Sequence, residues 1–473
     1  MKTVVGGGVR TKAGPSTPPT GGTGTRARTG RRAFVAVGLA LVLFVVGGLG
    51  LFRAVQPQSA SAHAPVTSGA GSALAEKPVI LSGSLQNAIA SLQQRLRAVP
   101  QDWQSWANLG LAYVQEGRVT ADPRYYPKAD GALRRSLQLH PDENFGAYTG
   151  EGALSLARHD FAGGLRWGEK ARAVNAYNGN VYGVIGDALV ELGRYPQAFA
   201  TIQHMVNLKP DLASYARVSY ARELKGDVPG AIAAMRMAFT ASATADDRAF
   251  TTYYLGELYF NSGRLDQAES WYRHGAELAP DYFPLQEGLA RVAWARGDVQ
   301  EAIRRYRAVV ARYPLPSYVV ALGDLYSAAG DTAHADRQYE LVRVEEKLFQ
   351  ANGVNVDLEL ALFDADHGSP AEALAAARAE WNRRHSILVA DALGWALYAN
   401  GRYADALRYA TFAGKLGYRN ALLYFHRGMI ERALGDLGAA RKDLREALAI
   451  NPHFSIQNSS VAERTLAKLG GGA

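Results

Sequence analysis

The chain has 473 residues, of which 48% are hydrophobic and 20% charged, so an entirely disordered protein is excluded. Its formal charge of +8 comes from 52 Lys and Arg against 44 Asp and Glu. Eight of the basic residues and none of the acidic ones lie in the first 53 positions, which leaves a formally neutral remainder and argues against a nucleic-acid-binding domain there. The absence of cysteine excludes disulfides, Cys-ligated zinc and thiol catalysis.

The charge and hydrophobicity of the N-terminal residues predict a membrane anchor. Residues 1–32 are rich in Gly, Thr, Pro and Arg and predict a disordered basic tail. Residues 33–52 contain no polar side chain, and twenty helical residues at ~1.5 Å each span ~30 Å, the thickness of a bilayer core. Seven Lys or Arg precede this run and only Arg53 follows it before Lys77. The positive-inside rule therefore predicts a single-pass cell-membrane protein with a cytoplasmic N-terminus and the rest outside the cytoplasm.

A cleaved export signal is the alternative interpretation of this segment, and it would give a secreted protein. Ala60-Ser61-Ala62 fits a small-residue cleavage site, and Arg31-Arg32 loosely resembles a twin-arginine signal. The apolar run is longer than the ~7–15 residues of a usual signal core, which favours the uncleaved anchor. Residues 53–83, rich in Ala, Ser, Pro and Gly, then predict a flexible linker.

A period of about 34 residues fills the chain from Trp103 onward. Small residues recur at fixed offsets, followed by a Gly, an aromatic or Leu, an Ala and a closing Pro. The clearest examples are Ile185-Gly186, Gly193, Tyr195, Ala198 and Pro210, and Leu255-Gly256, Gly263, Leu265, Ala268, Tyr272 and Pro280. The opening unit carries Trp106, Leu109, Gly110 and Tyr113.

This pattern resembles the tetratricopeptide repeat family. The resemblance implies an all-α, right-handed solenoid of about ten helix–turn–helix repeats over residues 103–453. Residues 84–102 would form a leading helix, and residues 454–473 a C-terminal capping helix with a Gly-rich tail. The second helices are expected to end near Pro141, Ala176, Pro210, Ala243, Pro280, Pro314, Lys347, His385, Tyr418 and Pro452.

Small residues are expected where the two helices of a repeat meet. The Gly at the eighth repeat position and the Ala twelve residues later lie on facing sides, and a later Gly, such as Gly193, Gly263 or Gly401, ends the first helix. The first unit has about seven extra residues around 118–125, which we expect in the turn between its helices. Boundaries near 350–385, in the least regular unit, stay open.

No catalytic, metal or cofactor site is expected. The ten His are scattered without paired ligand spacing. Asp364 and Asp366 resemble a calcium loop but lack its remaining ligands. The basic runs at 304–307 and 383–385 are expected to be solvated helix faces. The chain is therefore expected to be neither an enzyme nor a nucleic-acid-binding protein, and to have no small-molecule substrate.

The resemblance implies a concave groove lined by the first helices of the repeats, which in this family meets a protein or peptide partner. Aromatic and acidic residues are frequent at the corresponding positions, which suits a peptide with apolar and basic side chains. The candidate groove residues are Tyr220, Glu223, Phe250, Tyr253, Glu257, Phe260, Glu287, Arg291, Trp294, Asp324, Asp391, Trp395, Tyr398, Phe425 and Arg432.

The function expected from these features is a membrane-anchored scaffold or adaptor that binds protein or peptide partners in the groove, outside the cytoplasm. Two alternatives differ in class. The segment from Ile89 to Gly117 is similar to membrane-anchored repeat proteins that escort apocytochromes during haem attachment. An enzyme with a site in the insertion or in the least regular unit is the other, although no residues can be assigned to it.

Overall fold

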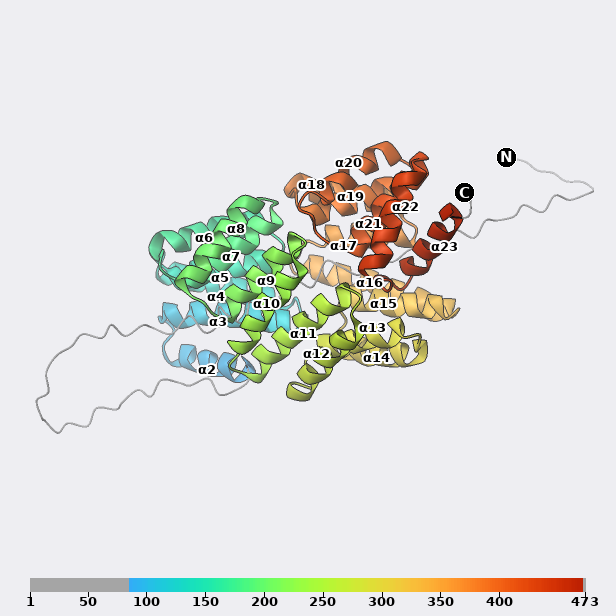
Figure 1. Ribbon diagram of the computed structural model, residues 1–473. Coiled ribbons are helices and arrows are strands. Elements are labelled where there is room, and N and C mark those ends of the chain that lie inside the picture. The colour runs from blue at the N-terminus through green and yellow to red at the C-terminus, as the bar shows by residue number, and fades with distance from the viewer. Residues whose placement is uncertain (1–84, 471–473) are drawn as a thin grey trace, which may run out of the picture. The chain divides into compact units, whose positions relative to one another are not determined.

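Residues 85–470 are described by a computed structural model and form 22 α-helices, with no strand in that range (Figure 1). All of these residues fall within one structural unit of the chain. The predicted all-helical repeat solenoid is confirmed. The predicted tail at 1–32, transmembrane helix at 33–52 and linker at 53–83 lie outside the described residues. Between residues 85 and 470, no helix combines the length and the apolar character needed to cross a membrane.

The helices pair in chain order, with α3/α4 to α21/α22 forming ten pairs between a first and a last single helix. Their bounds are α2 (Leu85–Ala98), α3 (Trp103–Thr120), α4 (Tyr125–Leu139), α5 (Phe145–Ala157), α6 (Phe161–Val174), α7 (Gly179–Glu191), α8 (Tyr195–Leu208), α9 (Leu212–Leu224), α10 (Val228–Thr240), α11 (Ala245–Asn261), α12 (Leu265–Leu278), α13 (Phe283–Ala295), α14 (Val299–Arg312), α15 (Pro316–Ala328), α16 (Thr332–Ala351), α17 (Asp357–His367), α18 (Pro370–Arg383), α19 (Ile387–Ala399), α20 (Tyr403–Ala413), α21 (Ala421–Leu434), α22 (Leu437–Ile450) and α23 (Asn458–Gly470).

The extra residues of the first pair lengthen α3 instead of lying in the turn. Helix α3 has 18 residues, whereas α5 and α7 have 13 each, and α4 begins five residues after α3 ends. The chain stays helical through Gly117, which packs against the ring of Tyr126, and leaves the helix only at Ala121, whose φ is 52°. The expectation that the insertion lies in the turn was therefore wrong.

Short polar side chains begin most of the helices, because they accept a hydrogen bond from a backbone N–H that the first turn leaves unpaired. Asp211 and Thr244 each form a full capping box with the residue three positions later. Side-chain N-caps are made by Asp102, Asn144, Asp160, Asn178, Asp211, Asp227, Thr244, Asp298, Asp331, Ser386, Asn420 and Asp436. These starts are local properties of the sequence.

Glycine in the first helix of a pair makes room for a large side chain of the second. A Cβ on Gly256 would lie 2.2 Å from the ring of Tyr272, and one on Gly288 of the next pair would lie 2.6 Å from the same fully buried ring. Gly394 shows the predicted contact with the Ala twelve residues later, since its Cβ would lie 3.2 Å from the carbonyl oxygen of Ala406. The two contacts with Tyr272 are too short for a larger residue unless the ring shifts, and the contact with Ala406 is a tight one.

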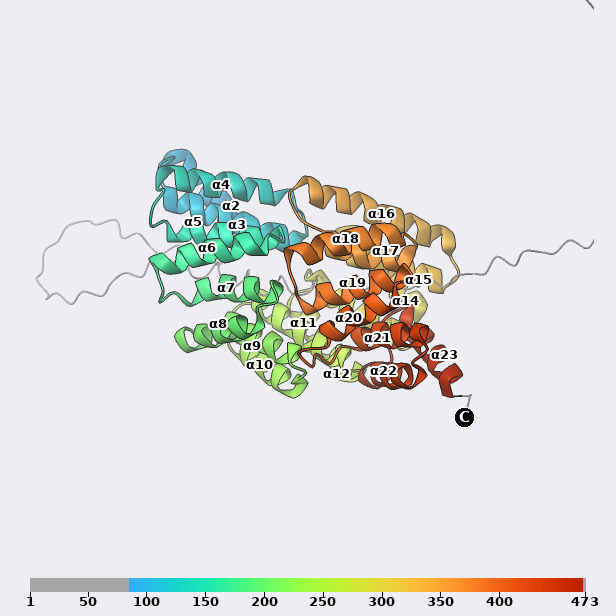
Figure 2. The ribbon, with the colours of Figure 1, turned by 90° about the horizontal axis from the view of Figure 1, so that it is seen from above.

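The solenoid is wound so tightly that each of the first five helix pairs contacts the pair five positions later in the chain. The turn inside each of the first five pairs contacts the end of the pair five positions later, and we call this line of contacts the seam. In Figure 2, α4–α10 and α16–α22 form the two adjacent rows that the seam joins. Hydrogen bonds across it run from Tyr313 Oη to the Arg118 carbonyl (2.9 Å), from the Asn355 N–H to the Arg158 carbonyl (3.1 Å), from the Ile387 N–H to Tyr195 Oη (2.8 Å) and from Tyr418 Oη to Glu223 (3.4 Å).

Two of the turn glycines are required by the seam as well as by the turn. Gly193 and Gly226 have φ of +75° and +74°, and a Cβ would lie 2.2 Å from the His385 carbonyl oxygen and 2.3 Å from the Gly417 carbonyl oxygen. Gly401, in the ninth pair, has the same conformation (φ +73°), but a Cβ there would have no atom within 4 Å. The predicted helix-ending role is confirmed for these glycines, and the seam adds a steric requirement to the first two.

A buried ion-pair cluster centred on Arg384 also closes the seam. Its side chain is 4% exposed, hydrogen-bonds to Glu191 across the seam and to Glu380 one turn earlier, and covers the ring of Phe161 at 4.4 Å. The expectation that residues 383–385 are solvated was wrong at Arg384, because the winding places the third pair against this helix end. Arg304, in the other basic run, is 75% exposed as expected.

Candidate functional site

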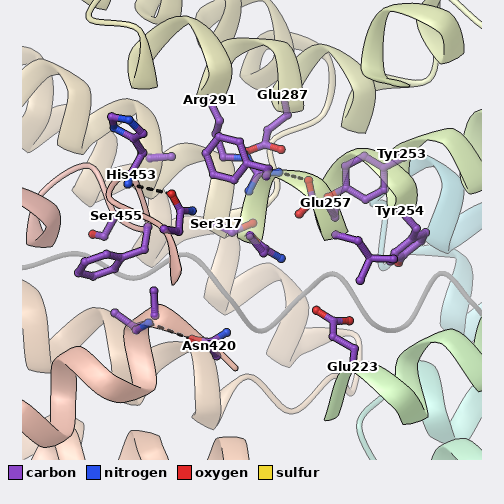
Figure 3. A pocket seen from close by; sticks show the side chains of 18 of the residues that line it. Glu223, Tyr253, Tyr254, Glu257, Glu287, Arg291, Ser317, Asn420, His453 and Ser455 are labelled. Carbon is purple, nitrogen blue, oxygen red and sulfur yellow. Dashed lines mark hydrogen bonds and ion pairs between the residues drawn. The ribbon is translucent and has the colours of Figure 1, made fainter. Parts of the chain in front are cut away.

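A cavity of about 160 Å³ lies between two walls of the solenoid (Figure 3). The first wall is formed by the first helices of four consecutive pairs, α9, α11, α13 and α15. The second wall is formed by the links at residues 418–422, between α20 and α21, and 451–456, between α22 and α23. The seam therefore covers part of the predicted groove and bounds it on a second side.

Nine of the fifteen predicted groove residues line this cavity, and six do not. The nine are Tyr220, Glu223, Tyr253, Glu257, Phe260, Glu287, Arg291, Trp294 and Asp324. The six that lie elsewhere are Phe250, Asp391, Trp395, Tyr398, Phe425 and Arg432. The predicted groove residues of pairs four to seven thus meet at this cavity, except Phe250 of the fifth pair, and those of pairs nine and ten lie elsewhere.

Of the six residues outside the cavity, two pack in the hydrophobic core and one is exposed on the surface. Phe250 is fully buried with its ring 4.7 Å from that of Tyr254, and Phe425 is fully buried with its ring 5.4 Å from that of Phe454. Arg432, near the end of α21, is exposed. Helix packing between neighbouring pairs therefore uses part of the surface that the resemblance assigned to a partner.

The other three belong to a polar network between α17, α19 and α21. Asp391 lies 2.9 Å from Nδ1 of His426, and the indole of Trp395 donates to Asp366 at 2.7 Å. The Trp395 ring stacks on His426 and on Tyr398, with centroids 4.1 and 4.6 Å apart. Neither these residues nor any others between 85 and 470 form a group of three or more His, Asp or Glu that could hold a metal ion.

One side of the cavity carries a buried charge cluster centred on Arg291. The guanidinium donates to Glu257, and its Nε lies 3.0 Å from Glu287. Tyr272 donates to Glu257 and Tyr306 donates to Glu287 at 2.7 Å. Burial raises the pKa of Glu287 to about 7, while the charge of Arg291 opposes the increase. The two carboxylates of this cluster are therefore satisfied by groups of the protein itself.

Asp324, on α15, is satisfied in the same way. Its Oδ1 accepts from Gln457 at 2.6 Å and Tyr339 at 2.9 Å, and lies 3.1 Å from Nε2 of His367. Burial raises the pKa of Asp324, and the hydrogen bonds from these three neighbours act in the opposite direction. Gln457 comes from the link before α23, so this carboxylate also ties the C-terminal end to the first wall.

Glu223 differs from the other carboxylates of the cavity. Glu257, Glu287 and Asp324 are at most 5% exposed, whereas Glu223 is only partly buried. Within residues 85–470 its carboxylate accepts one hydrogen bond, a long one of 3.4 Å from Tyr418. In Figure 3 it stands across the cavity from the Arg291–Glu257 pair, with its carboxyl group towards the intervening space. Burial, and then the charge of Glu257, raises the pKa of Glu223 to about 7.

The second wall was missed by the sequence analysis. Tyr418, Asn420, His453 and Phe454 line the cavity from links that lie about 90 to 240 residues after the first wall in the chain. Sequence spacing carries no signal for this meeting, because the number of pairs in one turn of the solenoid is not encoded at any single position. Burial lowers the pKa of His453, which faces Trp294 with ring centroids 6.1 Å apart.

Comparison with protein families identifies the repeats. A tetratricopeptide repeat model matches residues 82–136, 288–335 and 392–453, and a second model of the same description matches residues 253–282. These segments are tetratricopeptide repeats, and the predicted resemblance is confirmed for them. A search of curated protein sequences finds no match.

Solved structures of repeat proteins are similar over much of the chain. The Cut9–Hcn1 complex of the APC/C is 13% identical with a TM-score of 0.36, covering 81% of this chain and 93% of that one. A thermophilic repeat protein of Thermus thermophilus is 21% identical with a TM-score of 0.34, covering 45% and 100%. A repeat protein of Parabacteroides merdae is 18% identical with a TM-score of 0.32, covering 55% and 98%.

Proposed function

We propose that the protein is a membrane-anchored scaffold that holds a protein or peptide partner at the cavity, outside the cytoplasm. The observation that carries this proposal is the convergence of nine predicted groove residues, from four consecutive repeats, on one cavity. Tyrosine, tryptophan and arginine are the residue types that dominate binding energy at protein interfaces, because they combine a large apolar surface with a polar end.

We assign the cavity a binding role. Its Arg291 is paired with both Glu257 and Glu287, and Asp324 is held by three neighbouring side chains. A general acid or base must be free to exchange a proton with a substrate, whereas these groups are engaged with the protein. Burying and fixing polar groups in this way favours recognition of a partner over proton transfer.

The anchor part of the proposal is supported by the sequence of residues 33–52. Twenty consecutive residues without a polar side chain, flanked on one side by seven Lys or Arg, are typical of a membrane span with a cytoplasmic N-terminus. Anchoring would confine a captured partner to the membrane surface and raise its effective concentration there.

The topology can be tested by single-cysteine labelling, since the chain has no cysteine of its own. A membrane-impermeant maleimide applied to intact cells is expected to label Tyr177→Cys, at a position that is 88% exposed, and to label Thr11→Cys only after lysis. Labelling of both sites in intact cells, or of neither, would contradict the predicted orientation. Release of a shortened chain into the medium would support the secreted alternative instead.

Partner capture can be tested with a photo-crosslinking amino acid in the full-length protein. Placed at Arg419, an exposed residue of the cavity lining, it should give a discrete adduct with the partner. The same probe at Arg304, on the outer side of α14 and 75% exposed, should give none. Adding Trp294→Ala to the Arg419 probe should lower the adduct yield, because Trp294 lines the cavity and is only partly buried. Equal adducts at both probe positions would refute binding at this site.

A further inference from the structure

The charges that line the cavity do not balance. Four carboxylates, of Glu223, Glu257, Glu287 and Asp324, face the cavity with two guanidinium groups. The guanidinium of Arg419 is half-exposed and pairs with Glu446 at 3.0 Å, outside the cavity lining. Within the described lining, Arg291 is therefore the one guanidinium that pairs with carboxylates of the cavity. It is shared between Glu257 and Glu287.

Glu223 is the carboxylate that this arrangement leaves without a cation. Arg291 serves Glu257 and Glu287, and hydrogen bonds from three side chains serve Asp324. A partly buried carboxylate has lost some of its solvation and here has no positive partner, so a ligand that supplies the positive charge would be favoured. An anionic ligand would add to the existing excess of negative charge and would be excluded.

Aromatic rings line the same cavity as this carboxylate. They are those of Tyr220, Tyr253, Tyr254, Tyr318 and Tyr418, and Tyr418 donates to Glu223. Aromatic faces attract cations and also cover aliphatic chains, so a cavity that holds both rings and a carboxylate suits an alkyl chain that ends in a positive charge. The cavity already contains one such contact, since the guanidinium of Arg291 lies 4.5 Å from the ring centre of Phe260.

The cavity has room for a projecting side chain. About 160 Å³ is free between the two walls, whereas one water needs ~10–15 Å³ of such space. A long side chain of a partner can enter this space while the backbone that carries it stays outside.

We propose that the cavity receives the side chain of a lysine or arginine of the partner, and that its positive end pairs with Glu223. This inference rests on the proposed function and specifies the chemistry of the partner at that site. The positive charge favours the ionised form of Glu223, whose pKa in the empty cavity is about 7, so affinity should fall as the pH is lowered from 8 to 5. The other charged or titratable groups of the lining, apart from the tyrosines, are Glu257, Glu287, Asp324, Arg291, Arg419 and His453.

The test is calorimetric titration of the full-length chain in detergent with three probes of similar length. These are N-acetyl-lysine-N-methylamide, n-pentylammonium and, as the neutral control, n-pentanol. We expect both amines to bind and the alcohol to bind at least tenfold more weakly. Glu223→Gln should lower the affinity for the amines at least tenfold and remove most of its pH dependence, whereas Glu277→Gln, at an exposed site on α12, should change neither.

Glu223→Gln separates binding from folding. Glutamine has nearly the same shape as the protonated glutamic acid and carries no charge to bury, so the thermal midpoint at pH 8 should be equal to or higher than that of the wild type. Unchanged amine affinity in this variant, or equal binding of alcohol and amine, would overturn the inference. Binding of n-pentylammonium without binding of the capped lysine would overturn the assignment to a peptide side chain and indicate a free amine.

The inference and the proposed function can fail separately. If no probe binds while crosslinking at Arg419 still captures a partner, the lysine or arginine pocket is refuted and the scaffold proposal stands. If the amines bind and no crosslinked partner is found, the cavity is a cation site and the scaffold proposal is refuted.

Discussion

Gly256→Leu is expected to lower the free energy of unfolding by about 3 kcal/mol or more, at the upper end of overpacking effects. A Cβ at this position would already lie 2.2 Å from Cε1 of Tyr272, whose ring is fully buried. The ring has little room to move, because it is fully buried and Gly288 of the next pair also packs against it, where a Cβ would lie 2.6 Å away. Urea or thermal unfolding of the variant measures the effect.

Gly131→Leu is the matched control for this experiment. Gly131 also lies inside a helix, α4, but it is exposed and a Cβ there would meet no atom within 4 Å. Leucine has a higher helix propensity than glycine, so this variant should be unchanged or more stable by up to about 1 kcal/mol. Equal destabilisation by both substitutions would mean that the loss at Gly256 does not come from the contact with Tyr272.

Removal of the charge at Arg384 is expected to cost about 3–5 kcal/mol of stability, because it leaves the buried carboxylate of Glu191 without a cation. Arg384→Met also takes one of two cations from Glu380, which keeps its pair with Arg383. Burial raises the pKa of Glu191 even with Arg384 present, and loss of the arginine would raise it further above the value in the unfolded chain. At low pH this carboxyl is protonated in both the folded and the unfolded chain, whereas at higher pH folding must bury its charge or keep its proton. The loss of stability relative to the wild type should therefore be larger at pH 8 than at pH 5.

Two comparisons isolate the charge effect at the seam. Arg304→Met removes a 75% exposed arginine from its pair with Glu301 and should cost less than about 1 kcal/mol. Adding Glu191→Leu and Glu380→Leu to Arg384→Met should restore part of the stability, because the unpaired charges are then absent. A triple variant no more stable than Arg384→Met alone would indicate lost packing, for example against Phe161, as the cause.

The seam also has a consequence for the site. Glu223 reaches Tyr418 across it, and the links that carry Tyr418 and His453 form the second wall of the cavity. A variant that opens the seam near Arg384 would therefore disturb a neighbouring row of the same contacts. The seam therefore joins the Arg384 cluster and the second wall of the cavity along one line of contacts, although the residues of the cavity lie on other helix pairs than Arg384.

The sequence alone determined the helix pairs and much of the first wall of the site. Caps such as Asp211, turn glycines such as Gly193, and the Gly256–Tyr272 contact act over distances of a few to sixteen residues, and such local requirements recur visibly at the repeat period. The groove positions carried over from the repeat pattern located Glu223 and Arg291 for the same reason, since each lies on the first helix of its own pair.

Only the tertiary structure decided that the groove is a cavity and that its second wall comes from the last two pairs. Each pair contacts chiefly its neighbours, and the small rotation from one pair to the next accumulates over five pairs before distant segments meet. No single residue encodes that sum, so the burial of Arg384 and the presence of Tyr418 and His453 in the same cavity as Glu257 could not be predicted. The repeat is a local property of this sequence, and the site is a property of how many repeats complete a turn.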